Sequence, residues 1–282
     1  MSTASRPTGR HTEIDIDAVT ALVEHVAATV VTPRFRTLLA GDISEKGPGD
    51  LVTVVDTEAE RVLTLGLGEI APGTPVVGEE DASARPEILG VLDGAPMSWV
   101  VDPLDGTQAF VDGSPDHAVM VALLEHGEAV AGWICLPQHG ATFVAQRGSG
   151  AYRNGVRLTR APTAQEPGDL RGGVAAWYLE AEVRARIEQN LQRLGPQAVT
   201  SARLWSGFSY AQVADGAQDF LVYSRTSPWD HAPGAVLLRE TGGVSRRFDG
   251  RDYRPGESGR GLLAAADTPS YDRVRSVLGL DR

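Results

Sequence analysis

The hydrophobic period of this 282-residue chain changes twice, and the order of these patterns restricts the folds open to it. Apolar residues recur at helical spacing over residues 13–40, where Pro33 is expected to end or kink the helix, and again over residues 56–70. Between residues 75 and 158, short apolar runs are separated by turn signals such as His126-Gly127, and residues 151–158 are expected to form antiparallel strands around Asn154-Gly155. Helical and strand patterns then alternate. We predict an α/β protein, an α+β layered sandwich in which helix and sheet layers alternate.

The predicted elements form one continuous domain. Strands are expected over residues 75–78, 97–101, 117–124, 128–136, 141–146, 151–158, 172–177 and 219–223, and later helices over residues 180–194, 206–214 and 229–241. We expect residues 1–11 to be a disordered tail and residues 12–282 to be a single domain. Within it, an N-terminal α+β lobe would span about residues 12–160 and a C-terminal α/β lobe about residues 168–282.

The composition narrows the possible partners and compartment. There are 37 acidic and 26 basic residues, so the formal net charge is −11, and neither a nucleic acid nor an anionic membrane surface is expected as a partner. No stretch approaches 18 apolar residues, and no membrane span is expected. The single cysteine, Cys135, is expected to be a buried small hydrophobic residue. We therefore expect a cytoplasmic protein without disulfides.

Two acids interrupt the apolar strand predicted over residues 97–101. In the segment Trp99-Val-Val-Asp102-Pro-Leu-Asp105-Gly-Thr107, carboxylates lie three residues apart at a strand end, where a rigid scaffold keeps side chains accessible. A Pro-Leu-Asp-Gly turn would aim both carboxylates at one point. Two carboxylates and a carbonyl are typical Mg²⁺ ligands. The alternative is a polar turn in which each Asp bonds its own backbone.

Acids recur at other element boundaries. Glu79 follows a predicted strand, Asp56 opens a predicted helix, and Asp230 lies in the first turn of another. Taken singly, Glu79 could belong to a solvated loop, and Asp230 could simply stabilise a helix N-terminus. Brought together, these acids would repel one another unless cations lay between them. The combination favours a metal site.

Four motifs occur together in a fixed order. They are Lys46-x3-Asp50-x2-Thr53-x2-Asp56, Gly78-Glu79-Glu80, the segment Trp99–Thr107, and Trp229-Asp230-His231-Ala-Pro-Gly. In order and spacing these motifs resemble the inositol monophosphatase family. The resemblance implies a Mg²⁺-dependent, lithium-sensitive phosphatase related to fructose-1,6-bisphosphatase and the bisphosphate nucleotidases. It also implies the layered fold of those sugar phosphatases and a homodimer.

The resemblance implies a set of metal ligands by position. Glu79, Asp102 and the carbonyl of Leu104 would hold a first Mg²⁺ ion. Asp102, Asp105 and Asp230 would hold a second, and a weaker third ion would lie near Glu79.

The resemblance also implies the catalytic and substrate contacts. Asp56 and Thr107 would orient and deprotonate an attacking water beside Glu79, and Gly106 would contact the phosphate together with Thr107. The implied substrate-binding residues are Asp105, Gly106, Thr107, Arg203, Tyr223, Arg225 and Asp230.

Some positions depart from the family pattern. Ala109 and Asp112 stand where the family usually has Asn and His, and Tyr223 stands where a Glu grips the inositol hydroxyls. Arg203 and Arg225 could line the pocket and suit a second anionic group, or they could be surface arginines.

Lys46 is the one lysine beside 25 arginines. Codon usage explains why lysines are rare, but Lys46 also stands at the family's lysine position. We expect it to position the loop that leads to Asp50 and Asp56.

Three functions follow. The first is a phosphatase acting on a small polyol or sugar phosphate through metal-activated water. The second keeps this chemistry but acts on histidinol phosphate, a fructose bisphosphate or an adenosine bisphosphate. The third is a catalytically silent, metal-binding regulatory protein, suggested by Ala109 and Tyr223 and opposed by the retained acids.

Overall fold

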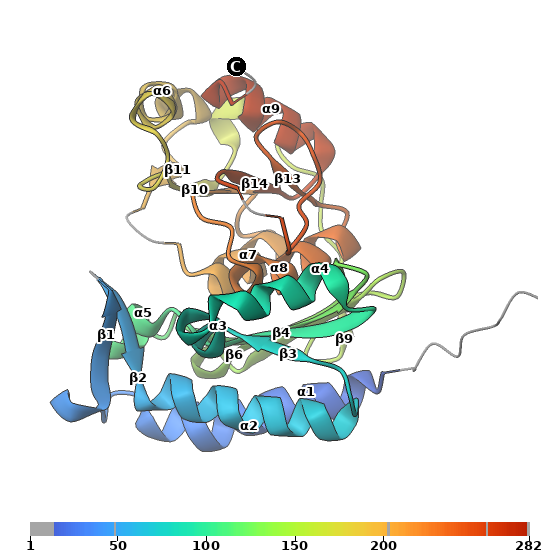
Figure 1. Ribbon diagram of the computed structural model, residues 1–282. Helices are drawn as coiled ribbons and strands as arrows, with labels where there is room; N and C mark the ends of the chain where they lie inside the picture. Colours follow the sequence, from blue (N-terminus) through green and yellow to red (C-terminus); the bar gives the residue numbers. More distant parts are fainter. Residues whose placement is uncertain (1–13, 48, 202–203, 258, 281–282) are drawn as a thin grey trace, which may run out of the picture.

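Helix and sheet layers alternate through the computed structural model, which describes residues 14–47, 49–201, 204–257 and 259–280 (Figure 1). From one side to the other, the layers are a helix pair, a seven-stranded sheet, a second helix pair, a five-stranded sheet and a third helix pair. The three pairs are α1 (Ile16–Val26) with α2 (Val54–Ile70), α7 (Ser206–Ala214) with α8 (Pro228–Glu240), and α6 (Ala181–Leu191) with α9 (Thr268–Leu278). The predicted layered α/β architecture is confirmed. Residues 1–11 and Arg203 lie outside the described residues, and the division into lobes stays a prediction.

The seven-stranded sheet carries the hairpins expected from turn residues. In spatial order its strands are β3 (Val76–Gly78), β4 (Met97–Asp105), β5 (Ala118–Glu125), β6 (Glu128–Leu136), β7 (Ala141–Gln146), β8 (Gly150–Arg153) and β9 (Val156–Arg157). The β3–β4 pair is parallel and all other pairs are antiparallel. Both two-residue turns, His126-Gly127 and Asn154-Gly155, have positive φ at each position. This is the turn geometry that joins twisted strands tightly.

The strand predicted to end at residue 101 continues to Asp105, which corrects the prediction. Its pairing with β5 shifts register between Asp102 and Asp105, so a β-bulge accommodates Pro103. Because a bulged residue makes no ladder hydrogen bond, proline does not end the strand there. Gly106, at φ 81°, ends it instead. Both acids therefore lie on the strand itself and not in a turn beyond it.

The five-stranded sheet lies in the C-terminal half. Its order is β11 (Ala198–Thr200), β10 (Gly172–Ala175), β12 (Phe220–Tyr223), β14 (Leu262–Ala265) and β13 (Val244–Arg247). β10 is parallel to β11 and β12, whereas β14 is antiparallel to both of its neighbours. The sequence pattern had predicted only β10 and β12. Outside both sheets lie the hairpin β1 (Ile43–Gly47) and β2 (Asp50–Thr53) and the helices α3 (Glu79–Ala84), α4 (Val91–Gly94) and α5 (Thr107–Val111).

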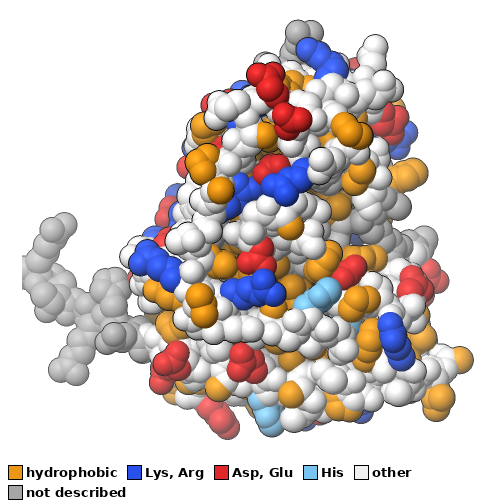
Figure 2. All heavy atoms as spheres, turned by 180° about the vertical axis from the view of Figure 1, so that it is seen from behind, with side chains coloured by type: hydrophobic (Ala, Val, Ile, Leu, Met, Phe, Trp, Pro, Cys, Tyr) orange, Lys and Arg blue, Asp and Glu red, His pale blue; other side chains and the backbone are white. Residues whose placement is uncertain are grey.

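Three apolar cores hold the layers together. One joins α1 and α2 to the seven-stranded sheet, a second surrounds α7 and α8 between the sheets, and a third lies under α6 and α9. Cys135 belongs to the first core, and burial raises the pKa of its thiol to about 11, so the prediction of a buried small residue is confirmed. On the face shown in Figure 2, basic and acidic side chains are interspersed.

The first helical segment is apolar for a structural reason. Over Ile16–Arg34 it is long and apolar enough, by length and composition alone, to cross a membrane. However, Val19, Val23 and Val26 are fully buried against the neighbouring layers. The apolar stripe is thus part of the core. As predicted, the helix changes at Pro33, where a 3-10 turn covers Thr32–Arg34.

Candidate metal centre and active site

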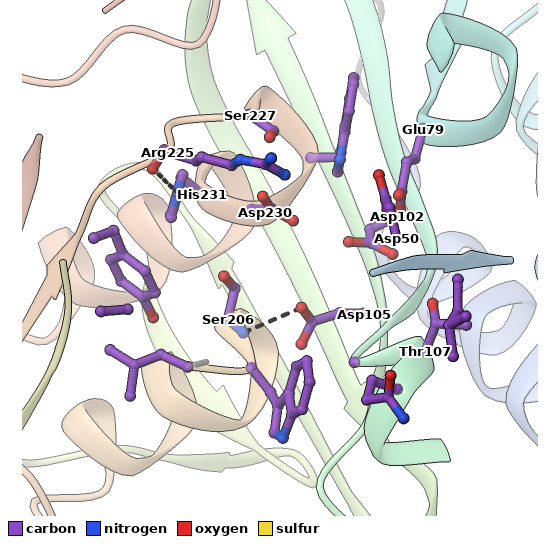
Figure 3. A pocket seen from close by; sticks show the side chains of 18 of the residues that line it. Asp50, Glu79, Asp102, Asp105, Thr107, Ser206, Arg225, Ser227, Asp230 and His231 are labelled. Atoms are coloured by element: carbon purple, nitrogen blue, oxygen red, sulfur yellow. Dashed lines mark hydrogen bonds between the residues drawn. The ribbon is translucent and has the colours of Figure 1, made fainter. Parts of the chain in front are cut away.

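One pocket of about 350 Å³ gathers nearly all the predicted site residues that the structure describes (Figure 3). Those lining it are Lys46, Glu79, Asp102, Leu104, Asp105, Gly106, Thr107, Tyr223, Arg225 and Asp230. Asp56 is not among the lining residues, but it contacts the pocket through a hydrogen bond to Thr107. The pocket volume is within the range usual for small-molecule sites.

Three acids form the centre of the pocket, here called the acid cluster: Asp102, Asp105 and Asp230. One carboxylate oxygen from each lies within 4.8 Å of the others. Asp102 and Asp105 come from the end of β4, and Asp230 comes from the first turn of α8, which packs on β4. Asp230 lies more than a hundred positions after the other two in the sequence, and the helix–sheet packing brings it to them.

The acid cluster is electrostatically unfavourable by itself. Burial, together with the nearby carboxylates, raises the pKa of Asp105 to about 7 and that of Asp230 to about 8. The same causes raise the pKa of Asp102 well above its ordinary value. Buried carboxylates that cannot all ionise together are stabilised by a cation between them. Because the ligands are hard oxygens, the cluster could bind a divalent metal ion.

Backbone amides of α7 hold Asp105 in place. Its carboxylate accepts hydrogen bonds from the N–H groups of Ser206 at 3.1 Å and Gly207 at 2.8 Å. A Cβ at Gly207 would lie 2.5 Å from the Cβ of Ala118 on β5, so glycine allows the close approach of α7. The positive end of this helix also favours the carboxylate charge.

Asp56 and Thr107 form an acid–hydroxyl pair beside the cluster. The Thr107 hydroxyl lies 2.9 Å from Asp56 Oδ1 and 3.1 Å from the Leu104 carbonyl oxygen. Thr53 fixes the other Asp56 oxygen, donating from its hydroxyl at 2.6 Å and from its backbone at 2.8 Å. Burial raises the pKa of Asp56 to about 6. The pair is therefore rigid and suited to accept a proton near neutral pH.

Glu79 is paired with an ammonium group. Lys46 Nζ, reaching from β1, donates to Glu79 Oε1 at 2.8 Å and to Glu80 Oε1 at 2.9 Å. Burial opposes the charge of Lys46, but the two glutamates outweigh it and raise the pKa of Lys46. The expectation that Lys46 positions its loop has a geometric basis here, since this contact ties β1 to α3.

One acid near the site, Glu60, was missed in the sequence, and Glu80 was named there only as part of a motif. Glu60 is buried and accepts from the backbone N–H groups of Glu80 at 2.8 Å and Asp81 at 2.9 Å, which fixes the start of α3. Glu80 contacts Lys46. A signal for Glu60 existed, because it lies four residues after Asp56 on the apolar face of α2.

Two histidines near the site, His231 and His117, bond to the backbone. His231 Nε2 donates to the carbonyl of Arg225 at 3.0 Å, and burial lowers the pKa of His231 to about 3. His117 Nδ1 lies 3.1 Å from the Ser114 carbonyl, and burial lowers its pKa to about 4. Both are neutral at pH 7.

The predicted substrate residues of the C-terminal half occupy different environments. Tyr223 is 5% exposed, and its ring lies 4.6 Å from the ring of His231. Arg225 is exposed at the pocket, with its guanidinium carbon 3.8 Å from the centroid of the Tyr178 ring. Sequence reasoning missed Tyr178 and its neighbour Trp177, although an aromatic pair directly after a strand is an unusual loop composition.

A layered α/β protein with a buried acid cluster beside an acid–hydroxyl pair has the features of a metal-dependent hydrolase. The model of the inositol monophosphatase family matches residues 13–276. The chain therefore belongs to the inositol monophosphatase family, whose homologues include phosphatases.

Individual relatives agree with this assignment. The chain is 31% identical over 214 residues to the fructose-1,6-bisphosphatase/inositol-1-monophosphatase of Thermotoga maritima, covering 75% of this chain and 77% of that protein. It is 33% identical over 230 residues to the Nus factor SuhB of Escherichia coli K12, covering 79% and 82%. The solved Thermotoga maritima IMPase superposes with a TM-score of 0.76 at 25% identity, covering 93% of this chain and 96% of that chain.

Proposed function

We propose that this protein is a Mg²⁺-dependent phosphomonoesterase that hydrolyses a small phosphate ester by attack of water. The observation that carries the proposal is the acid cluster, two buried carboxylates and one half-buried carboxylate within 4.8 Å, placed beside the Asp56–Thr107 pair. Such a site needs no Ser or Cys nucleophile, because water itself can attack the phosphorus.

The chain's own oxygens would hold the metal ions. Asp102, Asp105 and Asp230 would hold one ion, and Glu79, Asp102 and the Leu104 carbonyl another, with a weaker third near Glu79. When bound, such ions supply positive charge that lowers the pKa of water and stabilises the charge of the transferring phosphoryl group. Lys46 would have to share or release Glu79 when an ion binds there, since its Nζ lies 2.8 Å from the same carboxylate.

Thr107 and Asp56 would remove the proton from the attacking water. The Thr107 hydroxyl donates to Asp56 Oδ1 at 2.9 Å, which leaves its oxygen lone pairs free to accept the water proton. The proton would then pass to the Asp56 carboxylate, whose other oxygen is held by Thr53. Gly106 and Thr107 would contact the phosphate at the pocket floor.

The remaining assignments combine the family resemblance with the positions at which this chain departs from it. We propose that Arg203, Tyr223 and Arg225 contribute to substrate binding, together with Asp105 and Asp230. We further propose a cytoplasmic homodimer inhibited by lithium, with no nucleic-acid or membrane partner. The substrate classes to compare are polyol and sugar phosphates, histidinol phosphate, fructose bisphosphates and adenosine bisphosphates.

A second candidate is a regulatory role, supported by the 33% identity to proteins named Nus factor SuhB. The retained acid cluster argues against a catalytically silent form, because buried carboxylates with raised pKa values destabilise a protein that does not use them.

The test is phosphate release from a panel of these esters, with Mg²⁺ and with a chelator. We expect release above background from at least one ester, and loss of that release on chelation. Absence of release from every ester at saturating Mg²⁺ would refute the proposal and favour the regulatory role.

A further inference from the structure

Tyr210 and His231 form a buried hydrogen-bonded pair beside the acid cluster. The Tyr210 hydroxyl lies 3.2 Å from His231 Nδ1, Tyr210 is fully buried, and His231 is 1% exposed. Tyr210 comes from α7, and His231 directly follows Asp230 in α8. The proposed reaction uses neither side chain. Two apolar side chains would fill the same space without the cost of removing polar groups from water, so the pair calls for a role beyond packing.

The direction of this hydrogen bond follows from the other side of the imidazole ring. His231 Nε2 lies 3.0 Å from the carbonyl oxygen of Arg225, in the loop before α8 (Figure 3). A carbonyl oxygen can only accept, so Nε2 carries the proton of the neutral ring and Nδ1 carries a lone pair. The Tyr210 hydroxyl is therefore the donor. His231 thus connects α7 to the loop that leads into α8.

The pair is held tightly by its neighbours. The centroid of the His231 ring lies 4.6 Å from that of Tyr223 and 5.9 Å from that of Tyr253. The Tyr210 ring packs on the α8 backbone at Gly234, where a Cβ would lie 2.2 Å from the nearest ring carbons. Gly234 stands three residues after His231, on the same face of α8. Tyr210 therefore contacts α8 both through its ring and through its hydroxyl group.

The same two helices position two members of the acid cluster. The first backbone N–H groups of α7, one turn before Tyr210, donate to the Asp105 carboxylate at 3.1 and 2.8 Å. Asp230 lies in the first turn of α8. The separation of the Asp105 and Asp230 carboxylates thus depends on how α7 packs against α8, which is where the Tyr210–His231 hydrogen bond lies. Mg²⁺ requires near-ideal octahedral geometry with bonds of about 2.0–2.1 Å, so a small change in this separation should weaken metal binding.

We propose that Tyr210 is a positioning residue for the metal centre, and that its hydrogen bond to His231 sets the separation of Asp105 and Asp230. This inference rests on the proposed function, because it requires these acids to bind a divalent cation. Replacing residues that orient metal ligands typically changes metal affinity by about 10- to 100-fold. Tyr210 acts through the position of a helix and makes no direct bond to a ligand, so we expect the lower end of this range.

Calorimetric titration of the metal-free protein with Mn²⁺ tests the inference. Tyr210→Phe keeps the ring and removes the hydroxyl, and its Kd for Mn²⁺ should be about tenfold higher than that of the wild type. The matched control is Tyr271→Phe, which removes another buried tyrosine hydroxyl, bonded at 3.0 Å to the carbonyl of Arg247. Tyr271 lies on α9, in the third helix layer (Figure 1). We expect Tyr271→Phe to lower Tm by a similar amount and to bind Mn²⁺ like the wild type.

His231→Gln tests the same hydrogen bond from its other side and replaces Tyr210→Phe if that variant does not fold. The amide nitrogen of glutamine can still donate to the carbonyl of Arg225, but no lone pair remains at the Nδ1 position for Tyr210. The Kd for Mn²⁺ should rise by a similar factor. Adding Tyr210→Phe to His231→Gln should raise it further by no more than about twofold, because both changes remove one shared interaction.

An unchanged Kd in Tyr210→Phe, or an equal rise in Tyr271→Phe, would overturn the inference, as would independent effects that multiply in the double variant. Absence of Mn²⁺ binding by the wild type would overturn it together with the metal assignment of the proposed function. Absence of phosphate release with normal Mn²⁺ binding would refute the proposed function alone, and the ratio of the Kd values would still decide the role of Tyr210.

Discussion

The acid cluster and the aromatic residues Trp177 and Tyr178 line the same pocket but differ in burial and in chemistry. The cluster is acidic and largely buried, with Asp102 at 1% and Asp105 at 7% exposure and Asp230 half-buried, and backbone amides of α7 hold Asp105. The side chains of Trp177 and Tyr178 are about half exposed to solvent. Under the proposed function, the cluster would hold the metal ions, and the exposed rings would face the part of the substrate that lies outside the cluster. Substitutions in the acid cluster and substitutions of Trp177 or Tyr178 should therefore change activity in different ways.

The largest effect is expected at the cluster. Asp105→Asn removes a proposed metal ligand and places an amide N–H against the donors of Ser206 and Gly207. We expect kcat/KM to fall by about 10³-fold for every ester tested. Steady-state kinetics checks this, with Asp112→Asn as the control, because Asp112 is a surface acid bonded to Gln108. A loss of only a few-fold would show that the cluster is not the metal site.

A smaller loss is expected at the acid–hydroxyl pair. Thr107→Val keeps the shape but removes the hydroxyl that lies 2.9 Å from Asp56, so kcat should fall by about 10²-fold. Thr107→Ser should restore most of it. Because burial raises the pKa of Asp56 to about 6, the acid limb of the wild-type pH–rate profile should reflect its ionisation. An unchanged kcat in Thr107→Val would contradict the proposed proton transfer.

The cluster should also make the metal-free protein sensitive to pH. Asp230 and Asp105 have pKa values raised to about 8 and about 7, so the folded state holds protons that the unfolded state has released. Stability should therefore fall as pH rises through this range, and Tm in chelator should drop by about 3 °C between pH 7 and 8.5. The neutral histidines have the opposite effect, since they make stability rise with pH, but only below about pH 6.5, their unperturbed pKa.

Two controls make this measurement specific. Mg²⁺ should reduce the drop in Tm, because the ion offsets the repulsion between the ionised carboxylates. Asp230→Asn should reduce it without Mg²⁺. A Tm that rises between pH 7 and 8.5 would show that the cluster does not carry raised pKa values.

The smallest effect is expected at Lys46. Lys46→Arg keeps the charge but cannot place one compact ammonium between Glu79 and Glu80, which now lie 2.8 and 2.9 Å from Nζ. We expect the Mg²⁺ concentration for half-maximal rate to change by about two- to fivefold, with kcat nearly constant. Unchanged Mg²⁺ dependence would remove the proposed role of Lys46 at this edge of the site.

The part of the fold that could be predicted depends on local signals. The turns at His126-Gly127 and Asn154-Gly155 need positive φ. Glycine and asparagine are the residue types that favour this conformation, so both hairpins could be predicted from the sequence. β13 and β14 are four-residue strands that pair across a long connection and not through a two-residue turn, and they were missed. The end of β4 was misplaced because Pro103-Leu-Asp-Gly was interpreted as a turn after the strand, whereas a bulge accommodates Pro103 within it.

The parts of the site that could be predicted also depend on local sequence signals. The acids were found because they fall at element boundaries within recognisable motifs. The hydrogen bonds from Ser206 and Gly207 to Asp105 join residues about a hundred positions apart and arise only from helix–sheet packing. Trp177 and Tyr178 belong to no sequence motif, because an aromatic contact at a pocket needs only a planar ring at that position.

The most direct test of the account is to locate the bound cation. Crystals soaked in Mn²⁺ in place of Mg²⁺ should show an anomalous difference peak in contact with the carboxylates of Asp102, Asp105 and Asp230, and Asp105→Asn crystals should lose or weaken it. An anomalous map with no peak among these three carboxylates at saturating Mn²⁺ would contradict the central claim.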